Sequence, residues 1–248
     1  APAEPPAEPA RVRPTLNPVS TVTCRYLLNF GSETTLTMRD DGTNGDVTAG
    51  DEIFSALVPT TGLSPGHLLR WRIVAADSAA NQSTDPPYRD PLDNDQYFGT
   101  MAQTPTIQSQ LPVLYWFHNS GSTNVFATSE GGFRSALFYK LPTEAAGRFY
   151  DNVRLTLHGQ STAGFAKKSQ NVNFNADNRF KWREGEQEIS GMNLLSNYAD
   201  KSHVRNPPAW ETWNVIGHPS HWCQPVRVQQ ITAGNLNAGV DAQFLCIS

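Results

Sequence analysis

Hydrophobic and polar positions alternate over residues 69–75, which read Leu-Arg-Trp-Arg-Ile-Val-Ala. A period of two residues predicts a β-strand with one buried face. Shorter runs of the same texture, at residues 22–28 and 34–38, are separated by turn residues. Several such strands close together predict a β-sandwich of the immunoglobulin or fibronectin type over residues 19–104.

The pattern changes after residue 110. Residues 111–117 and 133–139 are strongly apolar strand candidates. Residues 153–157 alternate again and run into a loop of small residues, and a second strand returns around residues 172–174. A single substantial helix is expected between Asp200 and Gly217. The fold class predicted from these patterns is mainly β with some α (α+β).

Four segments follow from this organisation. The Pro-, Ala- and Glu-rich residues 1–18 are expected to be an extended linker. Residues 19–104 form the predicted sandwich, and residues 111–230 form a second β-rich module with the helix. Residues 231–248 form a divergent tail.

Composition narrows the function classes. The formal net charge is −4 over 248 residues, so no basic field is expected to hold a nucleic acid. No apolar run approaches the roughly 20 residues that a membrane-spanning helix needs. The chain has three cysteines, Cys24, Cys223 and Cys246, with neither a CxxC pair nor a zinc-finger spacing.

The acidic loop from Asp40 to Asp51 resembles a calcium-binding template, in which Asp40, Asn44, Asp46 and Asp51 are the candidate ligands. Gly42 stands where the template needs an oxygen ligand, and strands flank the loop where helices should be. Asp, Asn and Gly are also the residues that tight turns require. The sequence therefore favours a turn over a calcium site.

Three chemistries compete for the segment after residue 157. Gly159-x-Ser161 imitates the nucleophile elbow of hydrolases, but a lysine pair and a strand follow where a helix should begin. Gly159 and Gly164 have the spacing of a Walker A loop, but Phe165-Ala166 replace its Lys-Ser pair. The third interpretation is a strand–glycine loop–strand hairpin that carries a lysine, as protein kinases place over ATP phosphates.

A family resemblance supports the third interpretation. The segment His158-Gly159-Gln160-Ser161…Phe165-Ala166-Lys167-Lys168-Ser169 resembles the Arg-Gly-x-Ser…Phe-x-Lys-Lys-Ser signature of the CotH kinase family. Residues 193–206 are similar to that family's Leu-Asn…Asp-x-Ser…Arg-Asn block, and residues 225–228 resemble its next strand. The acidic loop in turn resembles one in Ig-like modules found beside CotH domains in bacterial surface proteins.

The resemblance implies the first lobe of an atypical, secretory-type kinase that binds ATP with Mg²⁺. The phosphate-covering loop would include Gly159, Ser161 and Gly164. Lys167 or Lys168 would be the phosphate lysine, and strand parity places Lys168 on the face of Val172 and Phe174. Glu211 is a candidate acidic partner of the lysine, although a solvated helix residue is an equal alternative.

The same resemblance assigns the predicted helix to the lobe. Asp200 or Ser202 would be its N-cap, and Pro207-Pro208 would occupy its first turn. The tryptophans beyond residue 110 could line a sugar site, but core packing is the better prediction at these spacings. They are Trp116, Trp182, Trp210, Trp213 and Trp222.

The family's second-lobe motifs, an Asn-Tyr-Asp…Asn loop and Trp-Asp-x-Asp, do not occur in this sequence. We therefore expect a truncated CotH-family protein, extracellular or at the bacterial cell surface, without kinase activity and with weak nucleotide binding at most. The alternative is a non-catalytic adhesion, carbohydrate-binding or structural assembly module. Its partner would be another protein, a surface polymer or a second copy of the chain.

Overall fold

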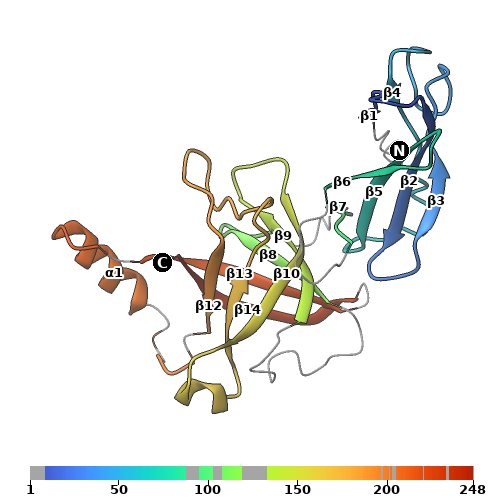
Figure 1. Ribbon diagram of the computed structural model, residues 1–248. Helices are drawn as coiled ribbons and strands as arrows, with labels where there is room; N and C mark the ends of the chain where they lie inside the picture. Colours follow the sequence, from blue (N-terminus) through green and yellow to red (C-terminus); the bar gives the residue numbers. More distant parts are fainter. Residues whose placement is uncertain are drawn as a thin grey trace. The chain divides into compact units, whose positions relative to one another are not determined.

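The computed structural model describes residues 9–87, 95–102, 108–118, 133–196, 198–200, 202, 205–219, 221–232 and 235–247. The chain divides into two compact units, Ala1–Gln103 (unit 1) and Thr104–Ser248 (unit 2). Figure 1 labels the helices and strands of both units.

The strands of unit 1 form one main sheet and a small ribbon. In the main sheet the order is β3-β2-β5-β6, and β7 also pairs with β5. The ribbon pairs β1 with β4. The bounds are β1 Ala10–Arg11, β2 Val19–Leu28, β3 Thr34–Thr37, β4 Ile53–Phe54, β5 Leu68–Asp77, β6 Gln82–Asp85 and β7 Phe98–Met101.

One face of this sheet carries the apolar core of unit 1. Cys24 on β2 and Leu69 on β5 are buried there, together with Ala56 and Val58 from the segment after β4. The ribbon and this irregular segment supply the second layer of the core. The structure thus shows the main sheet and the β1–β4 ribbon, whereas the immunoglobulin-type sandwich remains a prediction.

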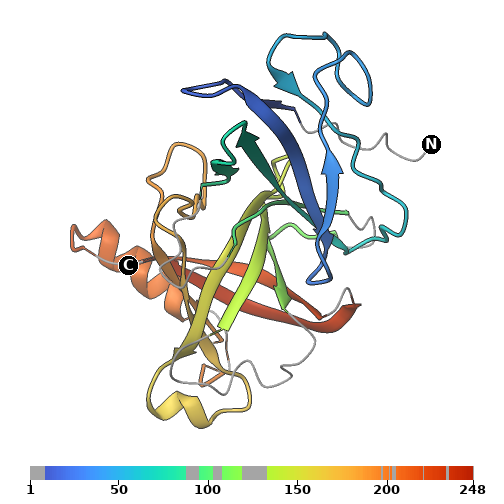
Figure 2. The ribbon, with the colours of Figure 1, turned by 45° about the vertical axis from the view of Figure 1, so that its right-hand side comes forward.

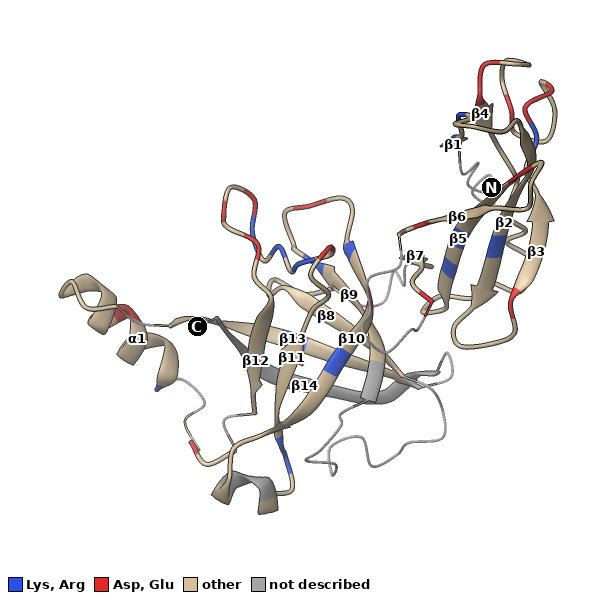
Figure 3. Ribbon diagram, viewed as in Figure 1, with Lys and Arg blue, Asp and Glu red and all other residues tan. Residues whose placement is uncertain are grey.

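The other face of the sheet differs from what the alternating pattern of β5 suggests. Arg70 and Arg72 are only 6% and 8% exposed, so both faces of β5 are covered, not one. Arg72 donates two hydrogen bonds to Glu33 (Nε–Oε1 2.7 Å and Nη2–Oε2 3.2 Å), and the Tyr97 hydroxyl donates a third (3.0 Å). The Arg70 guanidinium lies 4.5 Å from the Tyr97 ring centroid. Figure 3 shows the basic residues on β2 and β5. A charged and aromatic layer thus covers this face.

Unit 2 closes into a β-barrel with the strand order β10-β11-β12-β14-β13-β8-β9. Its elements are β8 Val113–His118, β9 Phe133–Lys140, β10 Arg148–His158, the 3₁₀ turn η1 Ser161–Gly164, β11 Ser169–Asn173, β12 Gly191–Leu195, α1 Asn206–Val215, β13 Trp222–Thr232 and β14 Asn235–Ile247. The pairing of β8 with β13 is parallel, and the other pairings are antiparallel. Figure 2 shows these strands crossing as they curl around the barrel.

The last of these strands, β14, lies in the divergent tail of the sequence. It pairs with β13 along most of its length and with β12 at its end, where Leu194 lies opposite Leu245. The segment after residue 231 is therefore an integral barrel strand, since without it β12 and β13 would have no connection in the sheet.

Aromatic side chains fill one part of the barrel core. Phe180 is completely buried and stacks on Phe174, with ring centroids 4.9 Å apart. The ring centroids of Tyr139 and Tyr150 lie 5.0 and 5.3 Å from that of Phe180. Their hydroxyls remain satisfied, because Tyr139 donates to the carbonyl of Trp182 (3.1 Å) and Tyr150 accepts from the amide of Lys181 (3.0 Å). Burial raises the pKa of both tyrosines to about 12.

The helix α1 confirms the predicted helix, and the fold is mainly β with a single α-helix in the described part of the chain. It begins at Asn206, later than expected, and the N-cap is Arg205. The prediction of Asp200 or Ser202 as the N-cap is therefore wrong. Asp200 instead accepts hydrogen bonds from the amides of Ser202 (3.1 Å) and Arg205 (3.0 Å), which shape the turn before the helix.

The prolines of this segment behave as predicted. Pro207-Pro208 lie at the N-terminal end of α1, where a missing N–H leaves no intrahelical bond unmade.

Among the described residues, no helix is both long enough and apolar enough to cross a membrane.

Candidate functional site

The β10–β11 hairpin has the strand–loop–strand form that the sequence predicts. Leu155 lies opposite Val172 and His158 opposite Ser169, so the two strands pair up to the edge of the loop. The chain leaves β10 through Gly159 at φ +89°, a left-handed conformation that favours glycine. The short turn η1 then carries Ser161 to Gly164 before the chain returns.

The predicted loop residues lie together on this hairpin, and their surroundings are mainly aqueous. Gly159, Ser161 and Gly164 are exposed. A side-chain carbon added at Gly164 would meet no atom within 4 Å. The loop therefore has open space around Gly164, and only Gly159 needs glycine for its backbone conformation.

Ser169 and Ser196 hold the end of the loop that carries Lys167 and Lys168. Lys167 and Lys168 are partly buried, directly before β11. The Ser196 hydroxyl donates to the Lys167 carbonyl (3.1 Å), and the Ser196 amide donates to the Ser169 hydroxyl (3.0 Å). These bonds tie the lysine segment to the end of β12. The backbone that carries the two lysines is consequently held in place.

The remaining predicted partner, Glu211, lies on α1 and is exposed. In the part of the chain that the structure describes, no ion pair joins it to Lys167 or Lys168. The helix packs through Trp210, which contacts Cys223 and Leu195 at the end of the barrel. The structure thus places the loop and the lysines on one hairpin and Glu211 on another element, α1.

A polar groove of about 500 Å³ runs along β11 and β12, and the sequence did not predict it. Asn171 and Asn193 are directly opposite each other across the two strands, and both line the groove. Asn171 also meets the His158 ring (Oδ1–Nδ1 2.7 Å). The signal was present as an Asn at alternate positions of β11, but alternation alone does not distinguish a groove from an ordinary wet face.

Residues 155–230 match the family model described as CotH kinase protein. This part of unit 2 is similar to the CotH kinase family. The matched residues begin on β10 and include the glycine loop, both lysines, α1 and most of β13. No curated protein matches the chain. The CotH resemblance is therefore confirmed for this segment, and the immunoglobulin-like nature of the preceding unit remains a prediction.

In addition to a phosphate-binding loop, a CotH-type kinase needs a Mg²⁺ site. Among the described residues, the only group of three His, Cys, Asp or Glu side chains whose ligand atoms converge is in unit 1. The described residues of unit 2 thus offer cationic groups for phosphates, but their acidic side chains do not converge as a metal site requires.

The converging group in unit 1 is the acidic loop. One carboxylate oxygen from each of Asp40, Asp46 and Asp51 lies within 4.8 Å of the others. Several of these carboxylate oxygens already accept hydrogen bonds from backbone amides. Asp40 accepts from the amides of Gly50 (2.8 Å), Asp51 (3.1 Å) and Glu52 (3.1 Å), and Asp46 accepts from that of Gly42 (2.6 Å). Asn44 is exposed at φ +55° and serves the turn.

The tryptophans of unit 2 do not share one environment. Trp116 and Trp182 are buried in the barrel core. Trp213 on α1 and Trp222 on β13 are 49% and 42% exposed. Trp213 stacks on His218, with centroids 4.9 Å apart, and Trp222 packs on Trp182 at 5.4 Å. Packing accounts for Trp116 and Trp182, as the spacing of these residues suggests.

Proposed function

We propose that this chain is a CotH-family protein of the bacterial cell surface or secretome whose β10–β11 hairpin binds the phosphates of a nucleotide weakly, without transferring them. The observation that carries the proposal is the position of Gly159, Lys167 and Lys168 on one hairpin inside the CotH-matched segment. A glycine loop followed by a lysine is the part of a kinase that covers and neutralises phosphates.

The affinity is expected to be low for a physical reason. Ser161 and Gly164 are exposed, so a phosphate on this loop would remain in water. At the dielectric constant of water, a pair of unit charges 4 Å apart contributes only about 1 kcal/mol. We expect a dissociation constant for ATP in the millimolar range, corresponding to about −4 kcal/mol.

Phosphoryl transfer needs more than this hairpin supplies. Kinases stabilise the transferred group with metal ions held by acidic side chains and position the acceptor with a further Asp. The two second-lobe motifs that carry these groups in the CotH family do not occur in this sequence. Lys167 and Lys168 would hold and orient phosphates, and the described side chains of unit 2 provide no converging set for the metal.

The test combines calorimetry with radiolabelled ATP. The full chain is titrated with ATP and Mg²⁺ and then incubated with labelled ATP and either Mg²⁺ or Mn²⁺. We expect millimolar binding that the Lys167→Ala/Lys168→Ala variant loses, and no labelled protein. A Lys181→Ala variant is the matched control, because Lys181 lies outside the hairpin and pairs with Glu184. Label on the parent chain that the double variant loses would disprove the proposal.

The proposed extracellular location has independent support in a cysteine. Cys223 on β13 is disulfide-bonded, and Cys246 is its neighbour in the β13–β14 ladder. Structural disulfides persist in secreted and surface proteins and are rare in the cytosol. Labelling of intact cells with a membrane-impermeant biotin reagent tests the location. Exclusion of the chain from both the labelled fraction and the culture medium would contradict it.

One observation favours the alternative, an assembly module. None of the residues of α1 is buried, and Val215 and Ile216 at its end are 85% and 58% exposed. Contiguous exposed apolar surface is typical of a site that contacts a partner, and Val215 and Ile216 are adjacent. Light scattering tests self-association of the full chain. A concentration-dependent dimer that Val215→Ser/Ile216→Ser abolishes would favour assembly over nucleotide binding.

For the acidic loop of unit 1 we propose a structural turn that binds Ca²⁺ loosely at best. The amide hydrogen bonds to Asp40 and Asp46 support it, because those oxygens already have partners.

A further inference from the structure

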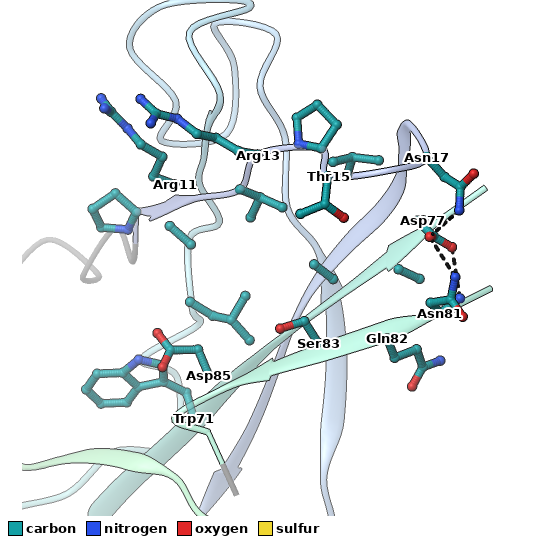
Figure 4. Close-up of a pocket in the computed structure, with 18 of the residues that line it drawn as sticks. Arg11, Arg13, Thr15, Asn17, Trp71, Asp77, Asn81, Gln82, Ser83 and Asp85 are labelled. Atoms are coloured by element: carbon teal, nitrogen blue, oxygen red, sulfur yellow. Dashed lines mark hydrogen bonds between the residues drawn. The ribbon is translucent and has the colours of Figure 1, made fainter. Parts of the chain in front are cut away.

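Unit 1 contains a groove of about 680 Å³ between the segment 9–17 and the edge of its main sheet. Figure 4 shows it in close-up, with Arg11 and Arg13 along one wall. Strands β5 and β6 form the opposite wall. All of the lining residues belong to unit 1, so the groove exists within this unit alone.

The floor of the groove is apolar and includes an aromatic ring. Trp71, Ile73 and Ala75 follow one another on the same face of β5, and all three line the cavity. Trp71 is partly buried and packs against Phe98, with ring centroids 6.1 Å apart. This floor is the continuation of the apolar core face beyond the ribbon that covers the rest of it.

Polar side chains face the same cavity from the neighbouring strand. Ser83 lies opposite Ala75 in the β5–β6 ladder, and Asp85 lies opposite Ile73. Directly opposed residues share one face of a sheet, so Ser83 and Asp85 project on the side of the apolar floor. Both are exposed, and both line the groove. An aliphatic surface and hydrogen-bonding groups therefore stand side by side.

A fixed hydrogen-bonded cluster closes one end of the groove. Asp77 accepts bonds from the side-chain amides of Asn17 and Asn81, each at 2.9 Å. The amides of Ala79 and Asn81 donate to its other oxygen, at 2.9 and 2.8 Å. These bonds lower the pKa of Asp77 to about 2 and hold the β5–β6 turn against Asn17. The wall at this end is consequently preformed.

The charges of the groove select the class of ligand. The lining includes two arginines, Arg11 and Arg13, and two acidic residues, Asp77 and Asp85, so it carries no excess of either sign. Arg13 is also paired with Glu52 (3.0 Å). A polyanion needs a cationic surface, and a lipid or other apolar ligand needs an enclosed apolar cavity. Neither description fits an open groove that is half polar and electrically balanced.

A sugar ring has matching chemistry, since its C–H face is apolar and its edges are hydroxyl groups. Aromatic rings provide a large flat apolar surface, while hydroxyl, amide and carboxylate groups supply directional hydrogen bonds at the edge. We propose that this groove binds a neutral oligosaccharide, with a sugar ring against Trp71 and hydroxyls bonded to Ser83 and Asp85. Unit 1 would then attach the protein to a glycan independently of any nucleotide on unit 2.

The experiment titrates the full chain with cellohexaose, xylohexaose, chitohexaose, mannohexaose and maltohexaose. Calorimetry measures affinity, and the indole N–H resonances in ¹H–¹⁵N NMR spectra locate the contact. At least one oligosaccharide is expected to bind and to shift the resonance that Trp71→Phe removes. Trp71→Ala should weaken that binding about tenfold or more, because the stacking surface is lost.

Two further variants keep the test valid if Trp71→Ala fails to fold. Ser83→Leu keeps an exposed strand position but places a branched side chain over the floor, so it should also weaken binding at least about tenfold by blocking access. Trp213→Ala, in unit 2, should bind as the parent does. The proposal is overturned if no oligosaccharide binds, or if binding is unchanged in both groove variants. In either case Ser83 and Asp85 serve only to keep the edge strand from pairing with other chains.

Discussion

The two units of this protein stabilise their sheets in opposite ways. Unit 2 curls its strands into a closed barrel and packs Phe174 and Phe180 against each other inside. Unit 1 leaves its main sheet open and covers one face with an ionic layer around Arg72 and Glu33. Apolar packing is insensitive to pH, whereas an ion pair depends on the protonation of its carboxylate. Two β-rich units that are adjacent in the sequence can therefore respond differently to the same change of pH.

The largest expected effect tests the aromatic core of unit 2. Phe180→Ala removes a completely buried ring that contacts Tyr139, Tyr150 and Phe174. A cavity of this kind costs about 3–5 kcal/mol of unfolding free energy. Urea unfolding followed by tryptophan fluorescence should show the transition of unit 2 at lower denaturant, with unit 1 unaffected. Phe98→Ala is the control, because Phe98 is 37% exposed and should cost much less.

The second prediction concerns Glu33 in unit 1. Burial alone would raise its pKa, but hydrogen bonds from Arg72 and Tyr97 outweigh burial, and the pKa lies below its usual value of 4.5. The unfolded chain therefore takes up the proton first as pH falls. The stabilisation is complete above about pH 4.5 and is lost as pH falls through the native pKa.

Glu33→Gln should destabilise unit 1 by about 2 kcal/mol at neutral pH, because the nearly buried Arg72 loses a charged partner. The variant should also lose much of the acid dependence that the parent shows between about pH 5 and pH 3. Denaturant titrations at both pH values measure this. Glu52→Gln, which removes only the exposed pair with Arg13, should change little. An unchanged acid dependence in Glu33→Gln would contradict the role of the ionic layer.

Local patterns in the sequence were sufficient for several elements, although not for β14, and they did not predict how the elements assemble. The β10–β11 hairpin and α1 follow from alternation, a glycine loop and two prolines, all within a few residues. The barrel depends on the parallel pairing of β8 with β13, where Val113 lies opposite Arg227. Nothing in either segment encodes a partner so distant in the chain. Similarly, Arg70 and Arg72 look solvent-facing until Tyr97 is brought over them by the fold.

The candidate site was predictable to the same extent. The family signature located the loop and the lysines, because these residues are close together in sequence. The position of Glu211 depends on where α1 docks, and the groove over Trp71 depends on a ribbon that joins residues 10 and 54. Both are tertiary features, so the sequence alone could only offer Glu211 as a candidate and did not reveal the groove.

The third prediction compares Gly159 and Gly164, two glycines of the β10–β11 hairpin. Gly159→Ala should cost about 1–2 kcal/mol, because alanine disfavours the left-handed conformation that φ +89° requires. Gly164→Ala should be neutral, since an added carbon meets no atom within 4 Å. Thermal unfolding of both variants measures the difference. Equal losses would show that the loop needs glycine at both positions and adopts a different backbone in solution.

The smallest expected effect is that of Ca²⁺ on unit 1. Asp40, Asp46 and Asp51 converge, but amide bonds to Asp40 and Asp46 already use part of their capacity, and Gly42 provides no side-chain ligand. With a millimolar dissociation constant, 1 mM Ca²⁺ would stabilise unit 1 by about 0.4 kcal/mol, or about 2 °C in melting temperature. Calorimetry should therefore detect millimolar binding or none. Asp41→Asn is the control, because Asp41 lies in the same loop outside the converging three. Micromolar Ca²⁺ binding that Asp46→Ala abolishes and Asp41→Asn retains would show that the loop is a metal site. Unit 1 would then owe part of its stability to an ion as well as to its ionic layer.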